Sequence, residues 1–525
     1  MKKVFSVAMI LLSFVSVHAQ FKEIAVSPGF DEPNSGQIKL LLMKDGSLAY
    51  VRVSVKHNID IRIYDSLKQE RAVTKILPSF EVLKKGSVEG CFEINGDIVL
   101  LISEIKKTPV LYRIIIDGKS GQLKTEEKLE ELQKLRWIQG YALLYGDNMK
   151  LPDFFVSKDP NSDNYAVALF NSFESERSKR IEIILFGSNH QIISRAYYSS
   201  PEEKYKYLEF VSMAVIGNEK VSVLVNGYNT PSHGGKHSEV ILANLDNGSS
   251  TVTFNELNFP KDKYLETGII QYNPATKQLV AVAKMREDKD STISKIHIGF
   301  VNPFTRKTEN IIETGLSESI LEKGRLIYGK KYIFFGAPES ILLNEDGSFL
   351  VLYHEIMPTY RQSINGVSYY TKSMDIVIAA YDVNGNLTDN YFIPKYHYIM
   401  GSFNLQSYAS DQSNQYKRIN WFKGKEKTYL ILNDSELNIE QIKQHKSPIE
   451  VMAISTYDAF YFELTGKNVL PERKFLFGRS ANEKEHRLAQ PGLSVYDKKN
   501  NLFITLRLQK EGKIKSANIV WLEPQ

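Results

Sequence analysis

The chain has 525 residues, of which 42% are hydrophobic and 11% aromatic, and its 66 Lys and Arg nearly balance its 61 Asp and Glu. Because these charges are interspersed, they give no field for nucleic acid or an anionic membrane, and we predict neither as a partner. The single cysteine, Cys91, excludes an intramolecular disulfide.

The N-terminal segment predicts export. Lys2 and Lys3 precede an apolar stretch from 4 to 17, and Ala19 provides the small-residue ending of a signal-peptidase site. We interpret residues 1–19 as a signal peptide and 20–525 as one domain, located in the periplasm or outside the cell. We expect no lipid anchor, because there is no cysteine near the cleavage site. No later segment approaches the roughly 20 apolar residues of a membrane-spanning helix.

A four-strand unit then begins and recurs along the chain. In its first copy, apolar runs at 38–43 and 48–55 flank the turn 44–47, and runs at 59–63 and 72–77 flank the turn 65–69. Asn-Gly and Asp-Gly pairs suit such hairpin turns, because these residues tolerate positive φ. The first turns of the successive units are at 44–47, 95–97, 159–164, 217–220, 273–277, 344–348, 424–427 and 498–501.

These units predict an all-β fold, a single β-propeller of about eight four-stranded blades, with seven as an alternative because no Trp-Asp repeat signature marks the blades. The last unit supplies only three runs, 493–496, 502–508 and 516–522, whereas one extra run, 21–26, precedes the first unit. We therefore expect the N- and C-terminal strands to pair and close the ring. The alternative is that both are edge strands of separate sandwiches.

Helices are predicted in three of the connections between strands. The first spans 126–136, with leucines recurring on one side, and the others span 317–323 and 435–446.

The lengths of the connections differ between the two faces of the expected ring. Turns between the first and second and between the third and fourth strands emerge on one face, which we call the tight-turn face. The remaining connections emerge on the opposite, long-loop face, where they are long and irregular, at 171–180, 226–239, 285–294, 354–374 and 433–448, and at 130–150, 314–339 and 394–415. Because function on rigid scaffolds concentrates in such loops, we predict the ligand site on the long-loop face.

Aromatic and basic residues are dense in some of these long connections. Rings with a few polar donors suit glycan or peptide recognition, although most of the 29 tyrosines will pack inside the protein. The candidate ligand-binding residues are Tyr360, Arg361, Tyr369, Tyr370, Tyr396, His397, Tyr398, Tyr228, His233 and His237.

Signals for metals and catalysis are weak. His233 and His237 are four residues apart but lack a helical HExxH context, and 159–163 begins like a calcium loop without its later glycine and glutamate. We predict no metal site and no cofactor, and interpret 159–164 as a strand turn. If the protein is an enzyme, Glu355 and Asp375 are the carboxylates to examine first.

The repeats as a whole resemble the β-propeller superfamily. The segments DIVIAAYDVNGN (375–386), YFIPK (391–395) and TYLILND (428–434) are also similar to parts of uncharacterised secreted proteins of Gram-negative bacteria. Neither resemblance carries a catalytic motif.

Three function classes remain open. The elaborate loops favour a non-enzymatic binding or scaffold protein that recognises a glycan, a peptide or an envelope protein. The alternatives are a propeller hydrolase or lyase acting on glycans or peptides, and a structural subunit of a cell-envelope assembly. Titratable groups converging in a pocket would favour an enzyme, and a broad apolar patch would favour the assembly subunit.

Overall fold

The computed structural model describes most of the chain after residue 20. The described residues are 21–31, 36–54, 58–80, 86–105, 108–132, 153–171, 174–200, 204–229, 238–287, 291, 294–363, 366–400, 416–451, 456–466, 469–480, 482, 485–511 and 514–525. The predicted signal peptide lies outside them.

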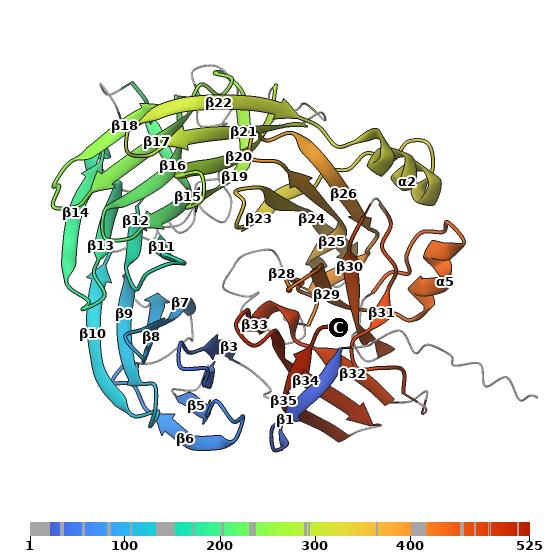
Figure 1. Ribbon diagram of the computed structural model, residues 1–525. Coiled ribbons are helices and arrows are strands. Elements are labelled where there is room, and N and C mark those ends of the chain that lie inside the picture. Colours follow the sequence, from blue (N-terminus) through green and yellow to red (C-terminus); the bar gives the residue numbers. More distant parts are fainter. Residues whose placement is uncertain are drawn as a thin grey trace, which may run out of the picture.

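Eight antiparallel sheets follow one another around a ring, which confirms the eight-bladed β-propeller (Figure 1). In the first four blades the strands run outward in chain order. Blade 1 has β3 (Gln37–Leu42), β4 (Leu48–Val53), β5 (Ile59–Tyr64) and β6 (Glu70–Ile76), and blade 2 has β7 (Gly86–Ile94), β8 (Asp97–Ile105), β9 (Pro109–Asp117) and β10 (Leu123–Glu131). Blade 3 has β11 (Asp153–Lys158), β12 (Tyr165–Phe170), β13 (Ile181–Phe186) and β14 (Ile192–Tyr198), and blade 4 has β15 (Tyr207–Ile216), β16 (Lys220–Tyr228), β17 (Glu239–Asp246) and β18 (Val252–Glu256).

The next three blades keep this order, and blade 6 gains a fifth strand. Blade 5 has β19 (Tyr264–Asn273), β20 (Gln278–Arg286), β21 (Ser294–Asn302) and β22 (Lys307–Thr314), and blade 6 has β23 (Ala337–Leu343), β24 (Phe349–Ser363), β25 (Gly366–Tyr381), β26 (Leu387–Ile393) and β27 (His397–Met400). Blade 7 has β28 (Asn420–Lys423), β29 (Thr428–Asp434), β30 (Asp458–Leu464) and β31 (Lys474–Phe475).

Both ends of the chain contribute to blade 8, as the sequence predicts. Its inner edge is formed by β32 (Glu485–Ala489) and β33 (Val495–Asp497), which both pair with β34 (Leu502–Glu511), and β34 pairs with β35 (Ile514–Glu523). The N-terminal strands β1 (Lys22–Val26) and β2 (Phe30–Asp31) pair with β35 from outside. Figure 1 shows β1, in blue, beside the red C-terminal strands. The ring is therefore closed by hydrogen bonds between the two ends of the chain.

Phe21, just before β1, anchors this closure. Its side chain is 6% exposed and its ring meets those of Tyr461, Tyr429 and Phe503 edge-on, with centroids 4.8, 5.2 and 6.1 Å away. These partners belong to blades 7 and 8, so Phe21 joins the N-terminal strand to the core between two blades.

Burial explains why the units need a ring. Every residue of β12, β13 and β29 is buried, although successive side chains of a strand point to opposite faces. Each sheet therefore has two apolar faces, and each face packs against a neighbouring blade. The first strands of successive blades lie side by side around the axis, with β3 beside β7, β7 beside β11 and β19 beside β23.

The predicted first turns of the units are confirmed. Asn95 and Gly96 adopt φ of 53° and 81° between β7 and β8. The turn at 159–164 joins β11 to β12, and Asp159 accepts a hydrogen bond from Asn161 N within it. This carboxylate therefore stabilises a strand turn, as predicted, and the part of the chain that is described holds no group of three or more potential metal ligands.

Three predictions about the connections are wrong. The connection expected at 394–415 contains β27, which pairs with β25. The segment expected as a helix at 126–136 continues β10 as far as Glu131, because its backbone pairs with β9 and that pairing overrides the helical spacing of its leucines. The connection expected at 354–374 is a continuous hairpin, since β24 and β25 pair from Phe349 to Ser363.

The other two predicted helices are present on the outside of the ring (Figure 1). They are α2 (Glu318–Tyr328), whose N-cap Ser317 accepts a hydrogen bond from Ile320 N, and α5 (Leu437–Lys443). Short 3-10 helices lie at Arg177–Lys179 and Pro491–Leu493. Cys91 is on β7 and partly buried, and burial raises the pKa of its thiol to about 12.

Phe21→Ala should lower the free energy of unfolding by about 3 kcal/mol, because it removes a buried ring and leaves a cavity in the closure. Val26→Ala, in the strand that follows Phe21 but 37% exposed in the native protein, is the matched control and should cost under about 1 kcal/mol. Urea unfolding of both variants measures the difference. Equal losses would show that the N-terminal strand does not anchor the ring through Phe21.

Candidate functional site

Blade 6 has the two longest of the described strands, β24 with 15 residues and β25 with 16, and both extend toward the long-loop face. After His354, β24 and β25 continue to pair with each other up to Ser363 and Gly366, whereas the pairing of β23 with β24 ends at His354. β27 then pairs with β25 from Tyr370 to Ser373. We call this three-stranded part the blade 6 extension.

Three of the predicted tyrosines meet on the blade 6 extension. The ring centroids of Tyr370 and Tyr398 are 6.1 Å apart at 80°, and those of Tyr396 and Tyr398 are 5.5 Å apart at 70°. The hydroxyls of Tyr396 and Tyr398 are 3.2 Å apart. Lys372 pairs with Tyr398 across the strands, and its Nζ lies 5.8 Å from the ring centroids of both Tyr396 and Tyr398.

All four side chains of this aromatic cluster are half-buried. Each ring is therefore held by its neighbours while part of it faces solvent, and the cluster combines apolar ring surface, hydroxyl groups and one cation. Such a combination suits an amphipathic ligand, because the rings contact its apolar faces and the hydroxyls and ammonium bind its polar groups.

The remaining predicted residues are not gathered here. His397 alternates with its two tyrosine neighbours and points inward, where it is 1% exposed with Nε2 3.6 Å from Asp434 Oδ1, and burial lowers its pKa to about 4. Tyr228 lies on β16 in blade 4, stacked 5.3 Å from Tyr207. The side chains of Tyr360, Arg361 and Tyr369, on the extension, and the whole of His233 and His237 lie outside the described residues.

A buried chain of polar groups, which sequence reasoning missed, lies at the base of the extension. Glu339 Oε2 is 2.8 Å from His354 Nδ1, and His354 Nε2 is 2.9 Å from Ser373 Oγ. Lys395 Nζ donates to Ser373 Oγ at 2.5 Å. Burial lowers the pKa of His354, so its neutral ring donates from Nδ1 to Glu339 and accepts at Nε2 from the serine hydroxyl.

The distances in this chain match those of a serine, histidine and carboxylate triad, but the exposure is inverted. Ser373 is 1% exposed, and its Oγ accepts a hydrogen bond from the fully buried Lys395. The side chain of Glu339, in contrast, is 46% exposed. A nucleophile must be the group that substrate reaches, and here the carboxylate is the accessible end. The arrangement therefore joins β23, β24 and β25 to the segment between β26 and β27 by hydrogen bonds.

The two carboxylates named for an enzyme lie on the other face of blade 6. Asp375 is 1% exposed and accepts hydrogen bonds from the hydroxyls of Tyr328 and Tyr332, at 2.6 and 2.8 Å, and from Lys395 N at 3.0 Å. Burial raises the pKa of Asp375 to about 6. Glu355 is 3% exposed, and burial followed by the charge of Asp375 raises its pKa to about 7.

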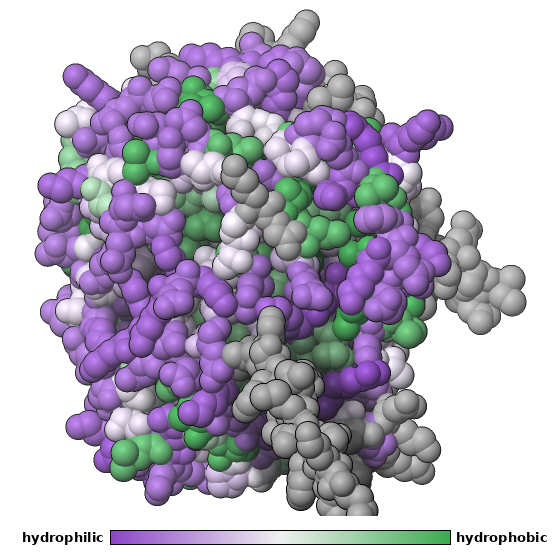
Figure 2. All heavy atoms as spheres, turned by 45° about the vertical axis from the view of Figure 1, so that its right-hand side comes forward, coloured by the Kyte–Doolittle hydropathy of each residue, from purple (hydrophilic) through white to green (hydrophobic). Residues whose placement is uncertain are grey.

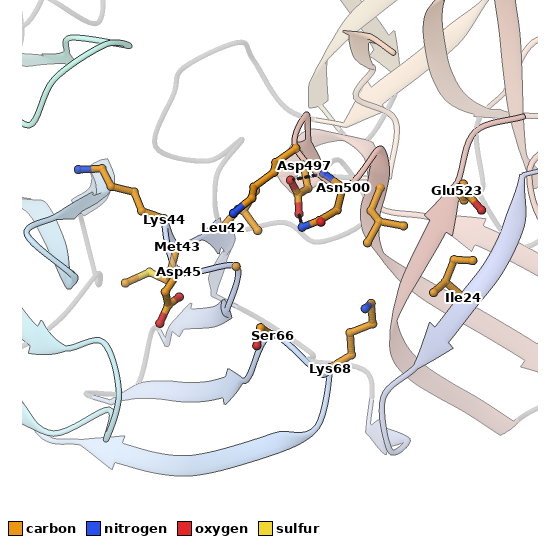
Figure 3. Close-up of a pocket in the computed structure, with 13 residues that line it drawn as sticks. Ile24, Leu42, Met43, Lys44, Asp45, Ser66, Lys68, Asp497, Asn500 and Glu523 are labelled. Carbon is orange, nitrogen blue, oxygen red and sulfur yellow. Dashed lines mark hydrogen bonds between the residues drawn. The ribbon is translucent and has the colours of Figure 1, made fainter. Parts of the chain in front are cut away.

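Two cavities open on the tight-turn face. One, of about 640 Å³, lies between blades 1 and 8 and is shown in Figure 3. Met43 and Asp45 line it on one side and Asn500, Lys68 and Glu523 on the others, with Asn500 Nδ2 donating to Asp497 Oδ2. The second, of about 720 Å³, lies among the first turns of blades 6, 7 and 8.

Comparisons with known proteins give no family for this chain. No family model matches it, and no curated protein matches it. Among solved structures, it is similar to a europium-containing methanol dehydrogenase, with 9% identity over 78% of this chain and 84% of that one and a TM-score of 0.39. It is also similar to the WD40 domain of SCAP from fission yeast, with 8% identity over 94% and 97% and a TM-score of 0.36.

A third similar structure is prolyl oligopeptidase B from Galerina marginata, with 8% identity over 91% of this chain and 55% of that one and a TM-score of 0.38. At these values no function passes to this chain, and its assignment as a propeller rests on its own sheets. The predicted likeness to secreted bacterial proteins stays a prediction.

The buried Glu355 should make stability depend on pH. The unfolded chain loses this proton near the usual pKa of 4.5, whereas the folded protein keeps it up to about pH 7. The folded state therefore loses stability as pH rises through this window. Glu355→Gln removes the ionisation, so its stability relative to the native protein should increase by about 2 kcal/mol between pH 5 and pH 8.

Urea unfolding at the two pH values measures this increase. The exposed Glu322→Gln is the control and should give the same small change in both buffers. A Glu355→Gln effect that does not vary with pH would show that Glu355 is ionised at pH 5 in the folded protein.

Proposed function

We propose that this chain is an exported, non-enzymatic binding protein that contacts a glycan or a peptide through the aromatic cluster of the blade 6 extension. The observation that carries the proposal is the convergence of Tyr370, Tyr396 and Tyr398 around Lys372 on a rigid extension of the long-loop face. Side chains on a paired sheet are positioned before the ligand arrives, so little ordering entropy is lost on binding.

The chemistry below the extension supports binding over catalysis. His354, Asp375 and Lys395 are buried and hydrogen-bonded within blade 6 and its neighbouring segments, and neither described cavity is lined by them. A general acid or nucleophile has to be within hydrogen-bond reach of the substrate. Ser373 and Asp375 fit a supporting role, in which they hold the extension on the blade.

The visible surface gives little support to a structural assembly subunit. On the face shown in Figure 2, apolar residues form separate patches between hydrophilic ones. The exposed large apolar side chains near α2 and α5 include Leu326, Ile333 and Leu437.

The proposed export depends on residues 1–19, which lie outside the described residues. Within the described residues, no helix is long and apolar enough to cross a membrane.

Each of the single variants Tyr370→Ala, Tyr396→Ala and Tyr398→Ala should bind the ligand more weakly by about 1 kcal/mol or more, which is roughly fivefold in Kd. The reason is that a few aromatic anchors dominate such contacts. A glycan array and a peptide array identify the ligand class, and calorimetry with the best ligand measures Kd. Melting temperatures confirm that the variants fold.

Tyr197→Ala is the matched control. Tyr197 is 47% exposed on β14 in blade 3, so the substitution should leave Kd unchanged. A further variant carries alanine at Tyr370, Tyr396 and Tyr398 together. If it binds the array ligand as tightly as the native protein, the aromatic cluster is not the contact site.

A further inference from the structure

The larger cavity on the tight-turn face has the composition of a small-molecule site. Its volume of about 720 Å³ is within the roughly 300–1,000 Å³ of ligand pockets. Three successive blades build it, through the ends of β23, β28 and β33 and the turns that follow them. Its aromatic wall has two parts, Trp421, which packs between blades 6 and 7, and Phe422 with Tyr496, which pack between blades 7 and 8. Leu342 and Leu343 add aliphatic surface.

The aromatic wall is rigid. Phe422 is 5% exposed and stacks on Tyr496, with centroids 4.4 Å apart at 23°, and on Phe503, 5.1 Å apart at 11°. Trp421 Nε1 donates to Ser340 Oγ at 2.9 Å, which fixes the indole to β23 of the neighbouring blade. Because the polar atom of Trp421 is already satisfied, what remains for a ligand is its ring surface.

The charged groups around this wall favour an anion. Lys423, Lys425 and Lys498 line the cavity together with two carboxylates. Asp346 accepts hydrogen bonds from Ser348 N and Oγ, at 3.0 and 2.6 Å, and these hold its pKa below its usual range. This carboxylate is therefore engaged in its own turn.

The second carboxylate, Glu345, competes only weakly with a bound anion for Lys498. Glu345 pairs with Lys498 at 2.5 Å, but the two side chains are 86% and 76% exposed, and such pairs are weak and screened by salt. Lys423 Nζ donates to the neutral Asn344 Oδ1 at 2.7 Å and lies near both carboxylates, and Lys425 is exposed. The cavity mouth therefore carries an excess of positive charge above an apolar wall.

We propose that this cavity is a second ligand site, which binds a small organic acid with a carboxylate on, or one methylene away from, a ring that has an apolar face. The ring lies against Trp421 and its carboxylate meets Lys425 and Lys423. Two sources share this chemistry, the uronic acid unit of an acidic glycan and an aromatic carboxylic acid. The site is on the face opposite the blade 6 extension and is independent of the proposed function.

Titration of the mature protein with a galacturonic acid trimer and, separately, with phenylacetate tests this site. The readouts are tryptophan fluorescence and calorimetry at low and high salt. At least one acid should bind, with its neutral counterpart, the galactose trimer or phenylacetamide, at least tenfold weaker, and binding should weaken with salt. Which acid binds identifies the source. No binding of either acid up to 10 mM, or equal binding of the neutral counterparts, would overturn the proposal.

Variants locate the binding. Lys425→Glu should weaken binding of the acid at least tenfold. Trp421→Ala should weaken it by a similar factor, measured by calorimetry because the variant lacks the fluorescent Trp421. Lys427→Ala, in the same turn but paired with Glu463 away from the cavity, is the matched control and should bind normally. Tyr396→Ala should also bind normally, which separates this site from the blade 6 extension. Native affinity in Lys425→Glu would place the acid elsewhere and overturn the assignment.

Discussion

The packing of blade against blade is the constraint on which the rest of the structure depends. Strands such as β12 and β13 bury every residue, so a single blade would expose two apolar faces to water. Neighbouring blades cover these faces, and the first and last blades find neighbours only when the ring closes. The cluster between blades 7 and 8 accordingly contains Phe21 from the N-terminus and Leu522 from the C-terminus.

Blade 6 buries several charged side chains at the base of its extension. Burying Lys395, Asp375 and Glu355 is costly unless each finds partners. Most of the partners come from other elements of the same blade or from helix α2 and the segment after it, as with Tyr328 and Tyr332 on Asp375. The result is a polar layer that holds the long strands β24 and β25 where they leave the blade, and the aromatic cluster stands on this base.

The two faces of the ring differ in how they offer binding surface. On the tight-turn face, short connections leave spaces between neighbouring blades open, and both described cavities lie there. On the long-loop face, the described binding surface is a projecting sheet with its aromatic cluster. A propeller can therefore present a cavity and a protrusion at once, because each arises from a different class of connection.

Local features of the sequence determined the fold. Apolar alternation, Asn-Gly turns and the missing last strand predicted eight blades and their closure, because strand and turn preferences act over a few residues. The sequence named Tyr370 in one connection and Tyr396 and Tyr398 in the next as candidates, but the contact between their rings depends on the pairing of β25 with β27. The alternation that separates His397 from them was missed because β27 was not recognised as a strand.

Only the tertiary structure decided the rest. Residues 126–131 form a strand because β9 lies beside them, although the spacing of their leucines suits a helix. Glu339, His354 and Ser373 lie on three different strands and Lys395 lies between two others, and Trp421 comes from blade 7 whereas Tyr496 and Lys498 come from blade 8. Such side chains are brought together by the pairing of strands and the closing of the ring. Because these interactions join residues far apart in the sequence, no local pattern predicts the contacts.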